Sequence, residues 1–162
     1  MRKLKCLSTL VIAFLFTIAI QAQNARDEAA MIQEAWGMAK KEVIKEYMEM
    51  APAESEKFWP IYDSYAAEKK KLGSERINLI KDYANVYQNM NDVQASDLTN
   101  RLFKNNIATE KLQMKYYKKL SKAVSPLEAS KFIQVEKYLE NVVRSELQEE
   151  IPFIGDKEGP QN

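Results

Sequence analysis

The sequence predicts an all-α protein made of long antiparallel helices, arranged as helical hairpins or as a four-helix bundle, without a β-sheet. Two observations support this prediction. Only 4 Gly and 5 Pro occur among the 162 residues, and most of them stand where a helix would begin or end. Between these breaks, apolar residues recur at steps of three and four, which places them along one face of a helix.

The expected helices, in chain order, span 27–48, 52–89, 92–123 and 126–150. Pro60 lies in the second and longest of them, where its ring removes an amide donor and should bend the helix or delay its start. Polar residues interrupt the middle of the third helix. The apolar stripes include Trp36 and Val43, Phe58 and Tyr62, Leu112 and Tyr116, and Phe132 and Leu139, and the interrupting residues are Asn105, Asn106 and Thr109.

Three of the expected helix starts can be laid over one another. Each has an apolar residue, then a cap position, then Glu or Gln three residues further on. Ser125 should form a capping box with Glu128, and Asn91 should do the same with Gln94, whereas Ala51 has no side chain that could cap. The pattern is open to two interpretations, a degenerate internal repeat or three unrelated caps. The segments run from Met50 to Glu54, from Met90 to Gln94 and from Val124 to Glu128.

The first residues have the order of a secretory signal peptide. Arg2, Lys3 and Lys5 precede an apolar run over 10–20, and small and polar residues follow it. The run is too short to span a bilayer comfortably. We therefore expect a signal peptide over 1–22, cleaved on export, with a retained anchor as the alternative.

The rest of the chain should form a helical domain over 23–154 and a disordered tail over 155–162. Loss of the signal would change the net charge from +1 to about −2, so the domain lacks the basic character typical of nucleic-acid binding. The expected location is the periplasm of a Gram-negative envelope. Contact with the membrane is expected only through an uncleaved signal.

Side-chain composition argues against catalysis, metals and cofactors. Cys6 is the only cysteine and lies within the expected signal, and the chain has no His. Disulfides, a thiol nucleophile and the commonest zinc sites are thereby excluded from the exported domain. No glycine-rich phosphate loop or nucleophile elbow occurs. We expect no enzyme activity, no catalytic residues, no metal site and no cofactor.

Four lysines form a basic stripe on the third expected helix. Lys111, Lys115, Lys118 and Lys122 stand at steps of four and three, so they share one side of the helix. One interpretation is a solvated helix face. The other is a surface that binds acidic clients, with apolar contact from the nearby Met114.

Two charged residues lie on faces that otherwise point inward. Arg76 of the second expected helix stands among apolar positions, and Glu136 of the fourth does so as well. An unpaired charge in such a position would be costly. We therefore predict a half-buried ion pair between Arg76 and Glu136 that fixes the register of the two helices.

The three similar helix starts resemble the LTxxQ signature of the Spy/CpxP family, which are small helical chaperones and stress-signalling proteins of the bacterial envelope. The match is degenerate: the segment beginning at Met90 keeps Gln94 but lacks the Leu and Thr, and the segment beginning at Val124 has Glu128 in place of Gln. A second resemblance, over about 47–153, is to a group of exported helical proteins of Gram-negative bacteria. It rests on Phe58 to Tyr62, Asp82 to Ala84, Lys115 to Tyr117, Phe132 to Glu136, and Ile151 with Pro152.

These resemblances imply an exported envelope protein that binds other proteins. One expected function is a Spy/CpxP-like chaperone that holds unfolded or stressed clients without ATP. The alternative is a periplasmic modulator or structural partner of one specific membrane protein. A homodimer is also left open, because long hairpins can leave apolar stripes that one bundle does not cover.

Overall fold

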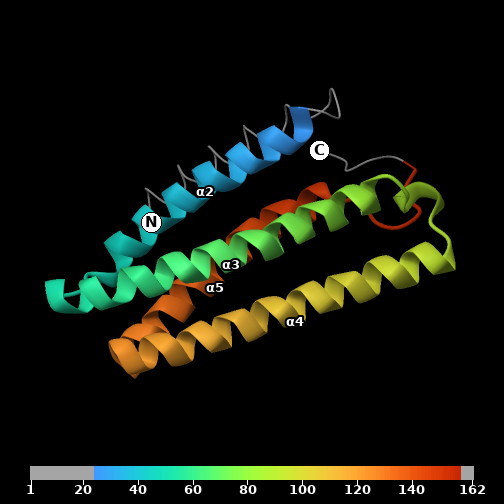
Figure 1. Ribbon diagram of the computed structural model, residues 1–162. Helices are drawn as coiled ribbons and strands as arrows, with labels where there is room; N and C mark the ends of the chain where they lie inside the picture. Colours follow the sequence, from blue (N-terminus) through green and yellow to red (C-terminus); the bar gives the residue numbers. More distant parts are fainter. Residues whose placement is uncertain (1–23, 158–162) are drawn as a thin grey trace.

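The computed structural model describes the backbone of residues 24–157, with side chains from Trp36 onward. This part of the chain contains four long helices, a short 3₁₀ turn and no strand (Figure 1), which confirms the all-α prediction. The expected signal peptide over 1–22 lies outside the described residues. The elements are α2 (Asn24–Met48), α3 (Pro52–Ala84), η1 (Tyr87–Asn89), α4 (Asp92–Ala123) and α5 (Pro126–Glu150).

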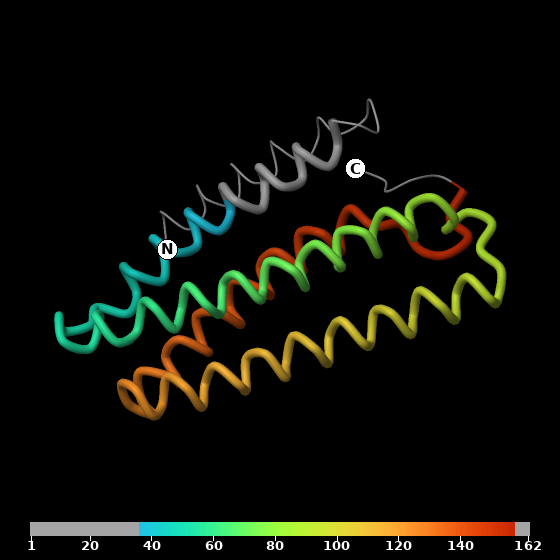
Figure 2. Tube along the Cα trace, viewed as in Figure 1, coloured from blue at the N-terminus to red at the C-terminus, as the bar shows by residue number. Residues whose placement is uncertain are grey.

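Successive helices run in opposite directions and are joined by short connections (Figures 1 and 2). Helix α4 packs against both α3 and α5, and the end of α2 packs against α5. None of the helices described over 24–157 combines the length and the apolar content that crossing a bilayer requires.

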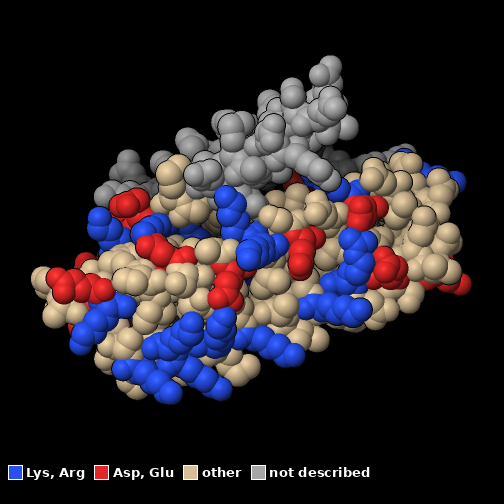
Figure 3. Space-filling view, in the orientation of Figure 1, with Lys and Arg blue, Asp and Glu red and all other residues tan. Residues whose placement is uncertain are grey.

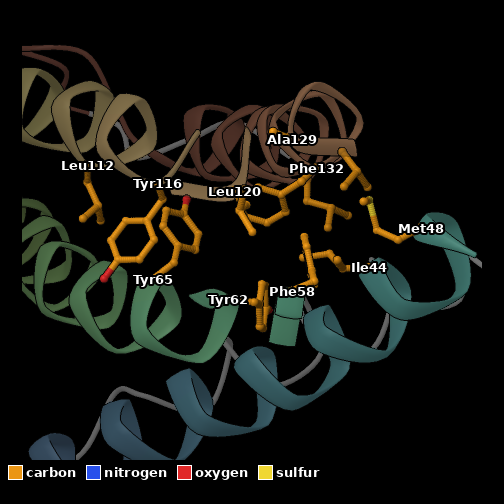
Figure 4. Packing of buried hydrophobic residues seen from close by; sticks show 12 residues of the cluster. Ile44, Met48, Phe58, Tyr62, Tyr65, Leu112, Tyr116, Leu120, Ala129 and Phe132 are labelled. Carbon is orange, nitrogen blue, oxygen red and sulfur yellow. The ribbon is translucent and has the colours of Figure 1, made fainter. Parts of the chain in front are cut away.

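Aromatic rings fill the core at the end where α2 turns into α3 (Figure 4). The ring of Phe132 on α5 packs edge-on against three rings of α3, with centroid distances of 5.6 Å to Phe58, 5.9 Å to Tyr62 and 5.3 Å to Tyr65. Edge-to-face pairs of this kind add about 0.5–1.5 kcal/mol each to the effect of burial. The regular spacing of apolar residues in the sequence therefore produces one dense cluster. The cluster also contains Ile44 and Met48 of α2, Leu112, Tyr116 and Leu120 of α4, and Ala129, Val135 and Leu139 of α5.

Side-chain caps are present at both helix starts for which they were predicted. The amide of Gln94 donates to Asn91 Oδ1 at 3.0 Å and the amide of Asn91 donates to Gln94 Oε1 at 3.1 Å, so the capping box of α4 is confirmed. At α5 only half of the box is present. Ser125 Oγ accepts from the amide of Glu128 at 3.1 Å, but the Glu128 carboxylate binds Lys131 at 2.7 Å instead of returning to Ser125. The other oxygen of that carboxylate has no hydrogen-bond partner among the described residues.

Helix α3 begins at Pro52, as predicted, and ends earlier than its apolar stripe suggested. It starts at Pro52 and continues through Pro60, so Pro60 does not delay it. It ends at Ala84 instead of residue 89 because the chain leaves helical geometry at Val86, whose φ is −129°.

The chain beyond α5 folds back onto the end of α3. Tyr83 Oη donates to the carbonyl of Pro152 at 2.6 Å, and the amide of Gly155 donates to the carbonyl of Tyr87 at 2.8 Å. Gly155 has a φ of +84°, which only glycine adopts without strain. Of the tail predicted to be disordered from residue 155, the structure describes 155–157, where Gly155 bonds to η1, and 158–162 lie outside the described residues.

Candidate functional site on the outer face of α4

The four lysines of the predicted basic stripe are all exposed on α4. Lys111, Lys115, Lys118 and Lys122 lie on the C-terminal half of that helix. Basic atoms gather there in the space-filling view, at the lower left of Figure 3. The spacing in the sequence thus predicted that these charges share one helix. Their contacts differ, because Lys115 forms an ion pair within the fold and the other three form none among the described side chains.

Lys115 connects α4 to α3. Its Nζ lies 2.7 Å from Glu68 Oε2, and Tyr116 Oη donates to the other oxygen of the same carboxylate at 2.7 Å. The hydrogen bonds from Lys115 and Tyr116 lower the pKa of Glu68 below its usual value. Lys115 is therefore engaged within the fold.

Lys111, Lys118 and Lys122 form no ion pair with any residue that the structure describes. The nearest acidic position along the helix is Glu110, whose carboxylate binds Lys137 of α5 at 2.7 Å. The three lysines therefore keep their charge available to a partner. A carboxylate of a binding partner could therefore pair with these lysines without displacing another carboxylate.

Apolar side chains stand on the same face of α4, and the sequence reasoning missed two of them. Phe103 is 57 % exposed, Ile107 is 53 % exposed and Met114 is 54 % exposed. Their steps of four and seven residues put them in line with Lys111 and Lys118. The signal was present in the sequence, since Phe103 and Ile107 fall outside the stripe through Leu112 and Tyr116 that packs inward.

We call Phe103, Ile107, Lys111, Met114, Lys118 and Lys122 the α4 strip. It extends over 20 residues, from Phe103 to Lys122, which is about 28 Å along the axis at the helical rise. Its first half is mainly apolar and its second half mainly basic. Large apolar side chains gathered on a surface mark interaction sites more often than scattered ones do. The strip can offer apolar contact and charge pairing to one extended segment.

The predicted ion pair between Arg76 and Glu136 is wrong in its partner. Glu136 is fully buried, as an inward position requires, but its Oε1 accepts from Lys40 Nζ of α2 at 2.6 Å and from Tyr65 Oη at 2.6 Å. Arg76 lies 11 residues beyond Tyr65 on α3, about 16 Å along the axis. It donates instead to Asn106 Oδ1 at 3.0 Å. The structure brings neither Arg76 nor Glu136 near the α4 strip.

A row of polar side chains continues from Glu136 along the interior. Gln113 Nε2 donates to Glu140 Oε2 at 3.0 Å, and Lys69 lies 3.4 Å from the same oxygen. Burial would raise the pKa of Glu140, yet Lys69 and Arg144 together hold it below its usual value. Asn105 donates to the carbonyl of Leu72 at 2.9 Å. Of the polar residues that interrupt the sequence stripe of α4, Asn105 and Thr109 are thus buried, and Asn105 and Asn106 have hydrogen-bond partners in the other helices.

The segments that resemble the LTxxQ signature lie at the starts of α3, α4 and α5. The starts of α4 and α5 use the capping side chains, and Ala51 forms no side-chain cap. None of the three segments contains a residue of the α4 strip. Comparison of the chain with protein-family models, with curated proteins and with solved structures gave no match.

Proposed function

We propose that this chain is an exported envelope protein that binds partly unfolded protein segments on the α4 strip, as an ATP-independent chaperone of Spy/CpxP-like type. The observation that carries the proposal is the alignment of exposed Phe103, Ile107 and Met114 with lysines that have no ion-pair partner among the described residues. Such a surface suits segments that carry both apolar and acidic side chains.

The chemistry of the strip suggests a weak and adaptable interaction. Met114 has an unbranched, polarizable side chain that can adjust to varied apolar partners. Lysines on an exposed face increase association rates and are screened by salt, since the Debye length is about 8 Å at physiological ionic strength. Binding should therefore weaken, without disappearing, as salt rises.

Export is the second part of the proposal and rests on the first residues of the sequence. The basic residues Arg2, Lys3 and Lys5, followed by the apolar run over 10–20, support a signal peptide. The absence of a glycine-rich phosphate loop in the sequence agrees with activity driven by binding equilibria alone.

The test is the heat-induced aggregation of two unrelated proteins, followed by light scattering, with and without the mature chain. One variant replaces Lys111, Lys118 and Lys122 with Ser. The matched control replaces Lys57, Lys70 and Lys71 of α3 with Ser, which removes the same charge from exposed helical positions. We expect both proteins to be protected, with protection reduced about tenfold in the α4 variant and retained in the control.

The outcomes separate the proposal from its alternative. Equal loss of protection in the two variants would mean that net charge, and not the strip, attracts the clients. Protection of neither protein would sink the chaperone proposal. Capture of one envelope membrane protein by the wild type, reduced by the α4 variant, would then favour a specific modulator that uses the same face.

A further inference from the structure

The interior of the bundle holds more cations than carboxylates on the side nearer η1. Lys69 and Arg76 of α3 and Arg144 of α5 surround Glu140, which lies 3.4 Å from Lys69 and 2.7 Å from Arg144. In this cluster three positive charges surround one carboxylate. The adjoining pair of Lys40 with Glu136, whose charges also act on Lys69, is itself balanced and leaves the excess at two positive charges. The excess lies in a partly desolvated place, where Lys69 is 20 % exposed and Glu140 is 18 % exposed, so it is poorly screened by water.

Arg76 is the cation with the weakest compensation. Its Nη1 donates to Asn106 Oδ1 at 3.0 Å, and Nη2 of Arg144 donates to the same oxygen at 3.4 Å. Two guanidinium groups therefore converge on one neutral acceptor. Burial and the charge of Arg144 both lower the pKa of Arg76 below its ordinary value. No carboxylate within the described part of the chain binds Arg76 directly.

Converging guanidinium groups are the arrangement that proteins use to bind oxyanions. The planar fork of an arginine matches two oxygens of a phosphate, sulfate or carboxylate group, and two forks can hold one anion between them. Arg76 donates one of its N–H groups to Asn106, and Arg144 donates others to Glu140. Both keep donors for a ligand, and the Arg144 side chain, 42 % exposed, gives access from solvent.

We propose that Arg76 and Arg144 bind a small tetrahedral dianion of the phosphate or sulfate class, with Lys69 contributing long-range attraction. The charge of such an anion equals the excess of two positive charges left by Glu140. A divalent anion would neutralise the cluster, whereas chloride would neutralise half of it and could not span the two forks. The site is separate from the α4 strip and does not depend on chaperone activity.

The test measures the thermal unfolding of the full chain and of its variants in sodium sulfate, sodium phosphate and glycerol phosphate, each against sodium chloride at equal ionic strength. A bound anion should raise Tm in a saturable way, by about 8 °C once its concentration exceeds Kd a hundredfold. Glycerol phosphate distinguishes the sources of the ligand. If it binds as well as inorganic phosphate, the site accepts a phosphate monoester such as a lipid headgroup; if it does not, the ligand is a free ion.

Four variants test whether these residues form the anion site. Arg76→Gln and Arg144→Gln should each abolish the saturable rise, and Lys104→Gln, an exposed cation of α4 outside the cluster, should keep it. Glu140→Gln should instead tighten anion binding by about tenfold, because it removes the competing carboxylate. Calorimetric titration of each variant supplies Kd directly.

An equal rise of Tm in the wild type and in both arginine variants would overturn the proposal, since it would show general exclusion of the salt from the protein surface. Absence of a rise beyond that in chloride, with no heat of binding, would also overturn it. If Arg76→Gln fails to fold, Arg144→Gln still decides the matter because its side chain is largely at the surface.

Discussion

Lys40 Nζ of α2 lies 2.6 Å from Glu136 Oε1 of α5, joining residues 96 positions apart in the sequence. The carboxylate is fully buried and the lysine side chain is 13 % exposed. The second oxygen of Glu136 has no hydrogen-bond partner among the described residues. The hydrogen bonds of this carboxylate therefore come from Lys40 and Tyr65, and α2 supplies one of the two.

Replacing Lys40 should be far more damaging than replacing an exposed partner of a salt bridge. Lys40→Met leaves a buried carboxylate without its cation, and we expect the free energy of unfolding to fall by about 3–5 kcal/mol. Lys137→Met removes the cation of an exposed pair with Glu110 and should cost less than about 1 kcal/mol. Urea unfolding of both variants measures the difference. Equal losses would mean that Glu136 is not held by Lys40.

The hydroxyl of Tyr65 should contribute more to stability than that of Tyr116. Tyr65 Oη donates to the buried Glu136, whereas Tyr116 Oη donates to Glu68, whose side chain is 42 % exposed. Tyr65→Phe should lower the free energy of unfolding by about 2 kcal/mol, and Tyr116→Phe by about 1 kcal/mol or less. Chemical denaturation of the two variants gives the comparison, and a reversed order would contradict it.

The protein should lose stability in alkali because its core tyrosines resist ionisation. Burial, with the hydrogen bond to Glu68, raises the pKa of Tyr116 to about 12, and burial with Glu136 raises that of Tyr65 further. The folded state then holds these protons more tightly than the unfolded state, so their contribution is complete below pH 10 and is lost as the pH rises through 12. Unfolding midpoints measured across this range should fall. A flat profile, or tyrosine absorbance that titrates in one step near pH 10 in the folded protein, would exclude this explanation.

Phe132 should be the most costly single truncation in the aromatic core. It packs edge-on against Phe58, Tyr62 and Tyr65 and is fully buried, so Phe132→Ala should cost about 3–5 kcal/mol. Leu127 on the same helix is 66 % exposed, and Leu127→Ala should cost less than about 0.5 kcal/mol. Guanidinium denaturation followed by circular dichroism measures both, and a small effect at Phe132 would mean that the core repacks around the missing ring.

Helix type and most helix boundaries could be predicted because their causes are local. Asn91 with Gln94 and Ser125 with Pro126 determine where two helices begin, and the apolar steps show which side of each helix faces inward. The end of α3 could not be predicted this way. It lies against the distant C-terminal segment, where Tyr83 donates to the carbonyl of Pro152 and the carbonyl of Tyr87 accepts from the amide of Gly155.

The candidate site residues show the same difference between local and long-range causes. The lysines of α4 lie on one face because of their spacing alone, which needs no knowledge of the other helices. The partner of Glu136 depends on how far each helix is displaced along its neighbours, and Arg76 lies about three turns further along α3 than Tyr65, which binds Glu136. The sequence contains no local signal that selects Lys40, because the choice comes from the way α2 crosses α5.

The interior changes along its length from interlocked rings near the turn between α2 and α3 to the polar row that includes Gln113, Asn105 and Arg76. The two ends of the molecule should therefore open independently. Partial opening at the η1 end releases groups that water can solvate, while opening at the other end must expose the rings around Phe132. In amide hydrogen exchange, the backbone amide protons of α3 between Phe58 and Tyr65 should persist longest, and those near Asn106 should exchange through smaller fluctuations. The η1 end of the bundle can then fluctuate while the end at the turn between α2 and α3 stays folded.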